Sequence, residues 1–107
     1  MKPSFTEKVF AAARKIPRGQ VATYAALARR LRNPHAARAV GNALNKSPGM
    51  APHLAARHRV PCHRVVRSDG SVGGFASGTM AKIALLKKEG VGVEKGKVDL
   101  KKFRNRI

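Results

Sequence analysis

Apolar residues at helical spacing open the chain and predict its first helix. Val9 and Ile16 belong to a series that recurs at intervals of three and four residues, which keeps side chains on one helix face. We therefore expect a helix over residues 5–15. Ser4 and Glu7 match a capping box, in which the serine accepts a backbone N–H bond and the glutamate reaches back. A proline and a glycine then end the helix.

A second, shorter helix is predicted over residues 24–31, after a short extended link at residues 20–22. Thr23 stands at the N-cap position, where a side-chain oxygen accepts a hydrogen bond from the first turn. Leu27 and Leu31 lie four positions apart, so both should face the core.

The third predicted helix, over residues 34–46, has two different faces. Asn33 before Pro34 is a start signal, because an N-cap residue is followed by proline in the first turn. The apolar stripe consists of Ala37, Val40 and Leu44, and the opposite face of Arg38, Gly41, Asn42 and Asn45. Two short helices, a turn and this helix match a helix-turn-helix, whose last helix enters a DNA groove. The same face is also compatible with an ordinary solvated helix surface.

The middle of the chain contains loops and short ordered segments. Residues 47–60 predict a basic loop with a short helical turn at 53–57. An extended run follows at residues 61–66, and a turn at 68–70. The glycine-rich segment 73–78 lacks the lysine of a phosphate-binding loop, so we interpret it as a tight loop.

A last helix is predicted from Thr79, as its N-cap, to about Glu89. Ile83 and Leu86 should face inward, and Gly90 stands at the C′ position, where glycine adopts a left-handed conformation easily.

The remaining residues, 91–107, show no clear period and predict a basic tail from about residue 95. We expect one domain over residues 1–107, because a chain of this length supports a single modest core. The expected fold is mostly α, a winged helix-turn-helix-like helical domain with short extended segments around Cys62.

Charge points to the class of partner. Lys and Arg number 23 against 5 Asp and Glu, a formal net charge of +18. Basic side chains that neutralise phosphates release condensed counterions, so this excess favours nucleic acid, with an anionic membrane surface as the rival. The chain has no apolar run of membrane-spanning length, no signal-peptide stretch and one cysteine. We expect a cytoplasmic, nucleoid-associated monomer that does not bind membranes.

The single cysteine is the leading candidate for chemistry. Cys62 is followed by His63, and neighbouring basic groups increase the population of a nucleophilic thiolate. In an extended segment the two side chains would point to opposite faces, so a water would bridge them. A histidine acting as a base works best when a third group orients it, and Glu89 could fold back to do so. From spacing alone an inert, packed cysteine is the commoner case, and the nearby histidines lack the ligand spacing of zinc sites.

Several stretches together resemble the O6-alkylguanine-DNA alkyltransferases, also called methylated-DNA–protein-cysteine methyltransferases. The residues that carry the resemblance are Thr23-Tyr24, Asn33-Pro34-His35-Ala36-Ala37-Arg38-Ala39-Val40-Gly41, Pro61-Cys62-His63-Arg64-Val65-Val66, Gly73-Gly74-Phe75 and Leu85-Leu86-Lys87-Lys88-Glu89-Gly90. About residues 4–100 align with the C-terminal catalytic domain of that family.

The resemblance implies a role for each matching residue. Cys62 would accept the alkyl group of O6-alkylguanine irreversibly, so each molecule would act once. His63 would take the thiol proton through a water, and Glu89 would orient His63. Arg38 would fill the space left by the flipped nucleotide. Tyr24 would crowd the target phosphate and donate a proton toward the leaving guanine.

The resemblance also implies the remaining contacts. Further DNA contacts would come from Ala37, Gly41 and Asn42, and the substrate pocket would be lined by Val65, Ser68, Phe75, Ala76 and Ser47. The partner would be double-stranded DNA containing O6-alkylguanine, and the reaction would need no cofactor and no metal. Family members bind through the minor groove, which fits the small residues on the third helix.

The sequence departs from the family in three places, and two other functions remain open. Ser47 replaces the usual hinge asparagine, the stretch from Ser47 to Cys62 is longer than usual, and Phe75 replaces a tyrosine. One alternative is an alkyltransferase-like protein that binds and flags alkylated guanine without repairing it. Such proteins typically carry tryptophan at the nucleophile position, and this chain has no Trp. The other is a winged-helix DNA binder without chemistry.

Overall fold

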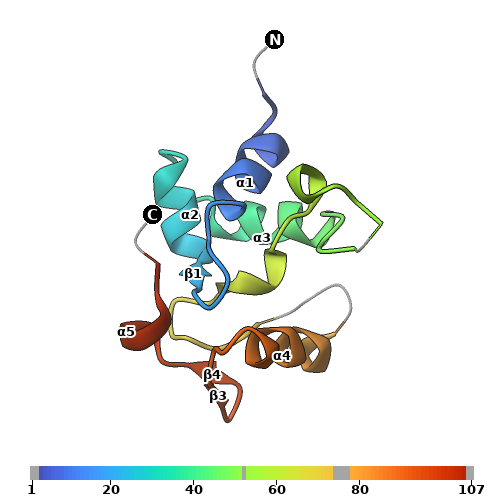
Figure 1. The fold of residues 1–107 in the computed structure, drawn as a ribbon. Coiled ribbons are helices and arrows are strands. Elements are labelled where there is room, and N and C mark those ends of the chain that lie inside the picture. Colours follow the sequence, from blue (N-terminus) through green and yellow to red (C-terminus); the bar gives the residue numbers. More distant parts are fainter. Residues whose placement is uncertain (1–2, 52, 74–77, 106–107) are drawn as a thin grey trace.

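The computed structural model describes residues 3–51, 53–73 and 78–105, and the fold is mostly helical, as predicted (Figure 1). The α-helices are α1 (Phe5–Ala13), α2 (Tyr24–Arg30), α3 (Ala37–Asn45), α4 (Thr79–Lys88) and α5 (Leu100–Phe103). Two 3₁₀ turns, η1 (Ala56–His58) and η2 (Cys62–Arg64), lie between α3 and α4. The strands are β1 (Ala22–Thr23), β2 (Val65–Val66), β3 (Val93–Glu94) and β4 (Lys97–Val98).

The first two helices begin at the caps that the sequence predicts. The Ser4 hydroxyl accepts a hydrogen bond from the Glu7 backbone N–H at 3.1 Å, and Thr23 accepts one from Ala26 at 3.0 Å. These bonds satisfy N–H groups that have no partner within the helix. The predicted reciprocal bond from the Glu7 side chain to Ser4 is not formed among the described residues.

The third helix begins three residues later than predicted. Arg32, with a φ of 60°, lies beyond the end of α2, and the Ala36 N–H donates to the Asn33 carbonyl at 3.0 Å. Asn33 and Pro34 therefore belong to a turn, and Ala36 takes the N-cap position without a side-chain bond. The prediction of a start at residue 34 was wrong because these residues close the turn that lays α3 against α2.

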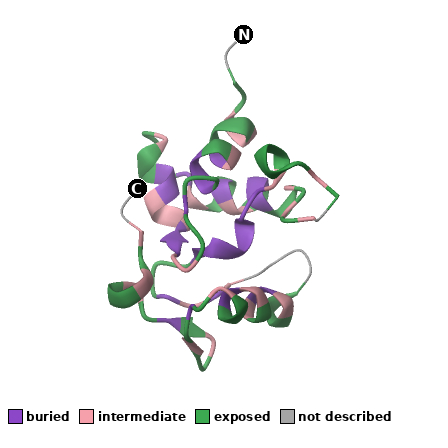
Figure 2. Ribbon diagram, in the orientation of Figure 1, coloured by how far each residue is buried: buried purple, intermediate pink, exposed green. Residues whose placement is uncertain are grey.

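Helices α1, α2 and α3 enclose the first of two apolar clusters, which we call the N-terminal cluster (Figure 2). Its buried members are Val9, Ala12, Ala13, Ile16, Ala22, Leu27, Ala28, Ala36, Val40, Ala43, Leu44, Val60, Cys62 and Val65. Val9, Ile16, Leu27, Val40 and Leu44, which the sequence predicted to face inward, are among them, because the 3.6-residue period places them on one face. Leu31 is only partly buried, and the prediction was wrong for Ala37, which is half-buried and lies outside the cluster.

The last long helix, α4, lacks the predicted N-cap. Thr79 is already its first helical residue, and Gly78, with a φ of 97°, precedes it without a side-chain bond. The Thr79 hydroxyl instead donates to the Gly73 carbonyl at 3.4 Å. At the other end Gly90 adopts the predicted left-handed conformation, with a φ of 89°.

The predicted tail is basic, but residues 91–105 are not a free extension, because they are folded against the rest of the chain. Strands β3 and β4 form an antiparallel hairpin, and α5 follows. The Val21 N–H donates to the Phe103 carbonyl at 2.9 Å, and the Asn105 N–H donates to the Val21 carbonyl at 2.7 Å. This region encloses the second apolar cluster, the C-terminal cluster, whose buried members are Val21, Val66, Val72, Leu86, Val91 and Val98.

A two-residue parallel pairing joins the two clusters. Strand β1 pairs with β2 so that Ala22 lies opposite Val65, and Thr23 opposite Val66. Successive residues of a strand face opposite sides, so Val65 packs into the N-terminal cluster and Val66 into the C-terminal cluster. The segment that follows Cys62 is therefore shared by both cores.

The long loop after α3 holds one 3₁₀ turn at 56–58, rather than a helical turn at 53–57 as predicted. The turn predicted at residues 68–70 is present, with a bond of 2.9 Å from the Gly70 N–H to the Arg67 carbonyl. Within the part of the chain that the structure describes, no helix has the length and apolarity needed to cross a membrane.

Candidate active site and nucleic-acid interface

Cys62 opens a tight turn that the sequence did not predict. The Cys62 N–H donates to the Val60 carbonyl at 2.8 Å, and the Arg64 N–H donates to the Pro61 carbonyl at 3.0 Å. Residues 62–64 form η2, so the predicted extended run holds only for the strand that follows. The apolar residues around the cysteine suggested a strand, but the turn bends the backbone before β2 begins.

This turn changes the expected relation between Cys62 and His63. Side chains in a 3₁₀ helix are spaced three to a turn, so neighbours diverge by less than they do in a strand. The opposite-face arrangement that an extended segment would impose is therefore absent. Cys62 is 9% exposed, and His63 is 1% exposed beside it.

The contact expected between His63 and Glu89 is present. His63 Nε2 lies 3.0 Å from Glu89 Oε1, and their side chains are 2% and 7% exposed. The two atoms are in direct polar contact, although Nε2–H is not aligned on the oxygen as a hydrogen bond requires. Glu89 reaches the histidine because it follows the last turn of α4, which packs against η2.

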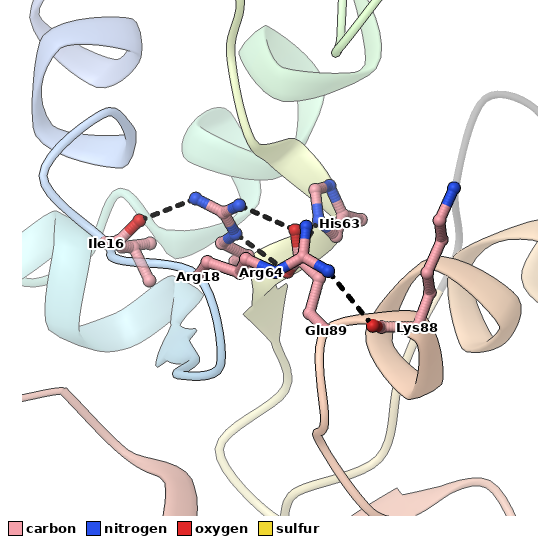
Figure 3. Close-up of polar contacts among 6 residues, drawn as sticks. All are labelled: Ile16, Arg18, His63, Arg64, Lys88 and Glu89. Carbon is pink, nitrogen blue, oxygen red and sulfur yellow. Dashed lines mark hydrogen bonds and ion pairs between the residues drawn. The ribbon is translucent and has the colours of Figure 1, made fainter.

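The same carboxylate holds Arg64, a residue to which the sequence analysis gave no role (Figure 3). Arg64 Nε donates to Oε1 at 2.9 Å, and Nη2 donates to Oε2 at 2.6 Å, so the pairing is bidentate. Its third nitrogen donates to the Ile16 carbonyl at 2.9 Å. Arg18 adds a bond of 3.1 Å to the Lys88 carbonyl. These bonds attach the end of α4 to the N-terminal region.

The charges of this buried group follow from its surroundings. Burial lowers the pKa of His63, although the nearby Glu89 carboxylate opposes the shift. Burial would raise the pKa of Glu89, but hydrogen bonds from Arg64 and the proximity of His63 outweigh it, and the pKa is lowered. At neutral pH the pair is therefore a neutral imidazole beside an ionised carboxylate.

The carboxylate also decides which imidazole nitrogen carries the proton. Nε2 faces Glu89, so we assign the proton to Nε2 and the free lone pair to Nδ1. Nδ1 is buried and has no hydrogen-bond partner among the described residues. The imidazole thus keeps one accepting nitrogen available inside the site, as a general base requires.

A buried lysine on α4 is the functional candidate that the sequence analysis missed. Lys82 is 0% exposed, and its Nζ donates to the Tyr24 hydroxyl at 3.3 Å while lying 5.5 Å from the ring centroid. Burial lowers its pKa to about 8, although a thiolate at Cys62 opposes the shift. Burial raises the pKa of Tyr24, and the same thiolate raises it further. One sequence signal could have identified Lys82 as buried. It lies one helical turn before Leu86, so the two side chains share the inward face of α4.

A hollow of about 480 Å³, which we call the α3 hollow, lies along the predicted polar face of α3. It is lined by Tyr24, Ala37, Arg38, Gly41, Asn42, Asn45, Arg67 and Ser68. The four predicted face residues therefore share one concave surface with the start of α2 and the segment after β2. A Cβ added at Gly41 would lie 3.7 Å from the Tyr24 ring, an ordinary contact, so glycine widens the hollow without being sterically required.

The other predicted pocket residues are spread more widely. Ser68 lines the α3 hollow, whereas Val65 is fully buried in the N-terminal cluster. Ser47 follows α3, and its buried hydroxyl has no hydrogen-bond partner among the described residues. Phe75 and Ala76 lie outside the described residues. Within the described ranges, no three His, Cys, Asp or Glu side chains are grouped to hold a metal ion.

Comparison with known proteins gives one consistent family. The sequence profile of the family described as 6-O-methylguanine DNA methyltransferase, DNA binding domain, matches residues 4–91. A methylated-DNA–protein-cysteine methyltransferase of Methanosarcina acetivorans is 43% identical over 86 residues, which cover 80% of this chain and 51% of the relative. A bifunctional methyltransferase/endonuclease of Picrophilus torridus is 38% identical over 90 residues, covering 84% of this chain and 28% of the relative. The chain thus spans about half, or less, of the length of these relatives.

Solved structures show the same fold. S. pombe Atl1, in complex with damaged DNA containing O6-carboxymethylguanine, has a TM-score of 0.80 and 30% identity, and the match covers 100% of both chains. Mycobacterium tuberculosis OGT in complex with DNA has a TM-score of 0.72 and 34% identity, covering 84% of this chain and 51% of that one.

Proposed function

The chain belongs to the 6-O-methylguanine DNA methyltransferase family, and from that premise we propose that it transfers the alkyl group of O6-alkylguanine in duplex DNA to Cys62. The observation that carries this proposal is the buried His63–Glu89 pair beside the only cysteine of the chain. A neutral imidazole with one accepting nitrogen is what a thiol needs in order to lose its proton.

The proposed reaction is a single displacement at carbon. The Cys62 thiol gives its proton, through a water, to His63 Nδ1, and Glu89 stabilises the resulting imidazolium. The sulfur attacks the alkyl carbon, an S–C bond forms, and the bond from that carbon to O6 breaks. The electron pair stays with guanine, which receives a proton from the Tyr24 hydroxyl. The products are guanine and S-alkylcysteine, a thioether without an easy leaving group, so each molecule reacts once.

The α3 hollow supplies the proposed DNA surface. Chemistry on a base in a duplex requires that the nucleotide leave the stack, at a cost of a few kcal/mol. We assign Arg38, which is exposed on α3 and lines the hollow, to fill the vacated space. Ala37, Gly41 and Asn42 line the same hollow and would contact the groove. The net charge of +18 favours the phosphates on either side.

Lys82 is the proposed positioning residue for this reaction. Its Nζ bonds to the Tyr24 hydroxyl, and a cation there favours a negative charge at Cys62. The phenol would thus be held for proton donation while the thiolate is stabilised. Replacing Lys82 by Met removes the charge and keeps the length of the side chain.

The test is intact-protein mass spectrometry after incubation with a duplex that contains O6-methylguanine. We expect the mass of one methyl group to appear, to saturate at one per protein, and to map to Cys62. The matched control is Cys62→Ser, which keeps the size of the side chain and should gain no methyl group. Methylation of the serine variant, or of another residue in the native chain, would show that the nucleophile is misassigned.

A second function is favoured by the full-length match to S. pombe Atl1. In that case the chain would bind and flag alkylated guanine without accepting the alkyl group. The native chain would then gain no methyl group, yet it would bind the O6-methylguanine duplex more tightly than an undamaged duplex in a gel shift. The absence of both the adduct and the preference would exclude both functions.

A further inference from the structure

A second basic hollow lies apart from the α3 hollow, and one of its lining residues, Arg64, pairs with Glu89 of the proposed active site. It measures about 440 Å³ and lies between the end of α1 and the long loop that follows α3. Its lining residues are Arg14, Met50, Ala56, Arg57, Arg59, Pro61 and Arg64, and none of them lines the α3 hollow. We call it the arginine hollow.

One backbone bond and one side-chain bond fix the walls of the arginine hollow. The Val60 N–H donates to the Gly49 carbonyl at 2.8 Å, which closes the base of the loop and keeps its two ends together. Arg14 Nε donates to the Arg59 carbonyl at 3.1 Å, which attaches the loop to α1. The loop is therefore held against the helix, and its side chains surround a defined space.

The hollow carries positive charge with little to neutralise it. No Asp or Glu occurs between Glu7 and Asp69, a stretch that supplies every wall of the hollow. Arg64 is already paired with Glu89, whose oxygens it shares with His63. Arg14 and Arg57, both exposed, form no ion pair with any described carboxylate.

The geometry of these groups suits a phosphate. A guanidinium presents five N–H donors, and the known bonds of Arg14 and Arg57 use only Nε, to the Arg59 carbonyl and to His58 Nε2. Their terminal nitrogens thus remain available for the bidentate pairing that guanidinium makes with phosphate. Met50, 37% exposed, and Ala56 add an apolar wall against which a sugar can pack.

We propose that the arginine hollow binds a backbone phosphate of DNA, as a second DNA-binding surface in addition to the α3 hollow. This proposal rests on the proposed function only in taking DNA as the partner. The phosphate would come either from the flank of the duplex that occupies the α3 hollow or from a second duplex. A backbone phosphate is the same in every sequence, so the added affinity would be independent of the lesion.

The test is the salt dependence of binding to an undamaged duplex. Each phosphate contact contributes about −0.9 to the slope of log K against log salt concentration. In the double variant Arg14→Gln/Arg57→Gln, which removes one phosphate contact, we expect the slope to become shallower by about 0.9. The charge-matched control is Lys101→Gln/Lys102→Gln, on the exposed face of α5, which should leave the slope near that of the native chain. An equal change in both double variants would reflect net charge alone and would overturn the proposal.

Shorter duplexes distinguish the two sources of the phosphate. If the flank of the same duplex supplies it, the difference between native chain and variant should vanish once the duplex is too short to reach both hollows. If a second duplex supplies it, the difference should persist, and the native chain should bring two differently labelled short duplexes into one complex. Arg57→Gln alone repeats the test without touching the bond between Arg14 and the loop.

The outcomes also separate this proposal from the proposed function. A native chain that binds no DNA would contradict the proposed function itself. A native chain that binds DNA with the same salt slope as Arg14→Gln/Arg57→Gln would overturn only the second surface. Methyl transfer to Cys62, measured at saturating duplex, gives an independent readout of the reaction.

Discussion

The N-terminal and C-terminal clusters are built in different ways. The N-terminal cluster is enclosed by three consecutive helices, each of which contributes a stripe of apolar residues. The C-terminal cluster collects single residues from separate segments, from Val21 before β1 to Val98 in β4. Local periodicity produces the first cluster, whereas the second depends on pairing between distant parts of the chain. The candidate active site lies where they meet: Cys62 belongs to the N-terminal cluster, and Glu89 follows α4, which contributes Leu86 to the C-terminal cluster.

The largest expected effect tests whether the C-terminal cluster contributes as much to the free energy of unfolding as the N-terminal cluster. Leu27 and Leu86 are both fully buried, one in each cluster. Each Leu→Ala change should lower the free energy of unfolding by about 2–5 kcal/mol, because burial is lost and a cavity remains. Urea unfolding measures both. Met80→Ala, at a residue that is 78% exposed, is the control and should change stability by less than about 0.5 kcal/mol.

A small effect of Leu86→Ala, equal to that of Met80→Ala, would mean that the C-terminal region contributes little to the folded state. The C-terminal region would then be loosely folded in solution, as a tail is, and the hairpin would not be a stable part of the fold.

The next effect tests the connection between the clusters. Glu89→Gln removes the carboxylate that pairs with Arg64 and leaves a buried guanidinium without its counter-ion. We expect a loss of about 3 kcal/mol in the free energy of unfolding at pH 7, measured in urea. Glu94→Gln, at an exposed residue, is the control and should have little effect.

The same variant has a defined pH dependence. The pKa of Glu89 is lowered in the folded chain, so its contribution is complete above its ordinary value of 4.5 and is lost as pH falls through the lower folded value. The native chain and Glu89→Gln should therefore converge in acid. A constant difference down to low pH would mean that the carboxylate stabilises the chain through something other than its charge.

A somewhat smaller effect concerns Lys82, the charge buried between the clusters. Its pKa is about 8 in the folded chain and 10.5 ordinarily, so between these values the unfolded chain binds more protons and stability rises with pH. Relative to Lys82→Met, the native chain should gain about 2–3 kcal/mol between pH 7 and pH 10. Urea unfolding of both proteins at the two pH values measures this difference. A difference that does not change with pH would place the folded pKa near its ordinary value.

The smallest expected effect concerns the cap of α1, a helix that packs only into the N-terminal cluster. Ser4→Ala removes the cap of α1 and should cost about 1 kcal/mol in unfolding free energy, measured in urea. Ser4→Asp is the matched control, since aspartate also accepts the N–H bond and should restore most of the loss. Equal stability of all three proteins would show that the end of α1 is frayed in solution.

The contrast between the clusters also explains which elements could be predicted from the sequence. The caps at Ser4 and Thr23 and the inward residue Leu27 follow from local rules, and the structure bears them out. The β3–β4 hairpin has strands of two residues each, too short for a period to appear. Its place in the fold depends on Val21, which lies far away in the sequence.

The candidate site also has features that the sequence predicts and features that only the packed structure shows. The contact between His63 and Glu89 was expected, because a carboxylate at the end of a helix can fold back toward the cysteine. The tight turn at Cys62 was not, since apolar β-branched neighbours favour a strand while the backbone bond to Val60 decides the geometry. Lys82 was missed because a lysine inside a helix is usually solvated, and only the packed structure shows it to be buried.

The bonds that join Val21 to Phe103 and Asn105 have a consequence for synthesis on the ribosome. The three helices of the N-terminal cluster are complete in the nascent chain long before these partners emerge. Val21 meets these partners late, because the backbone groups that close the C-terminal cluster around it belong to residues translated after all three helices. Contacts of such long range slow the final step of folding. We therefore expect the helix bundle to assemble before the second core closes.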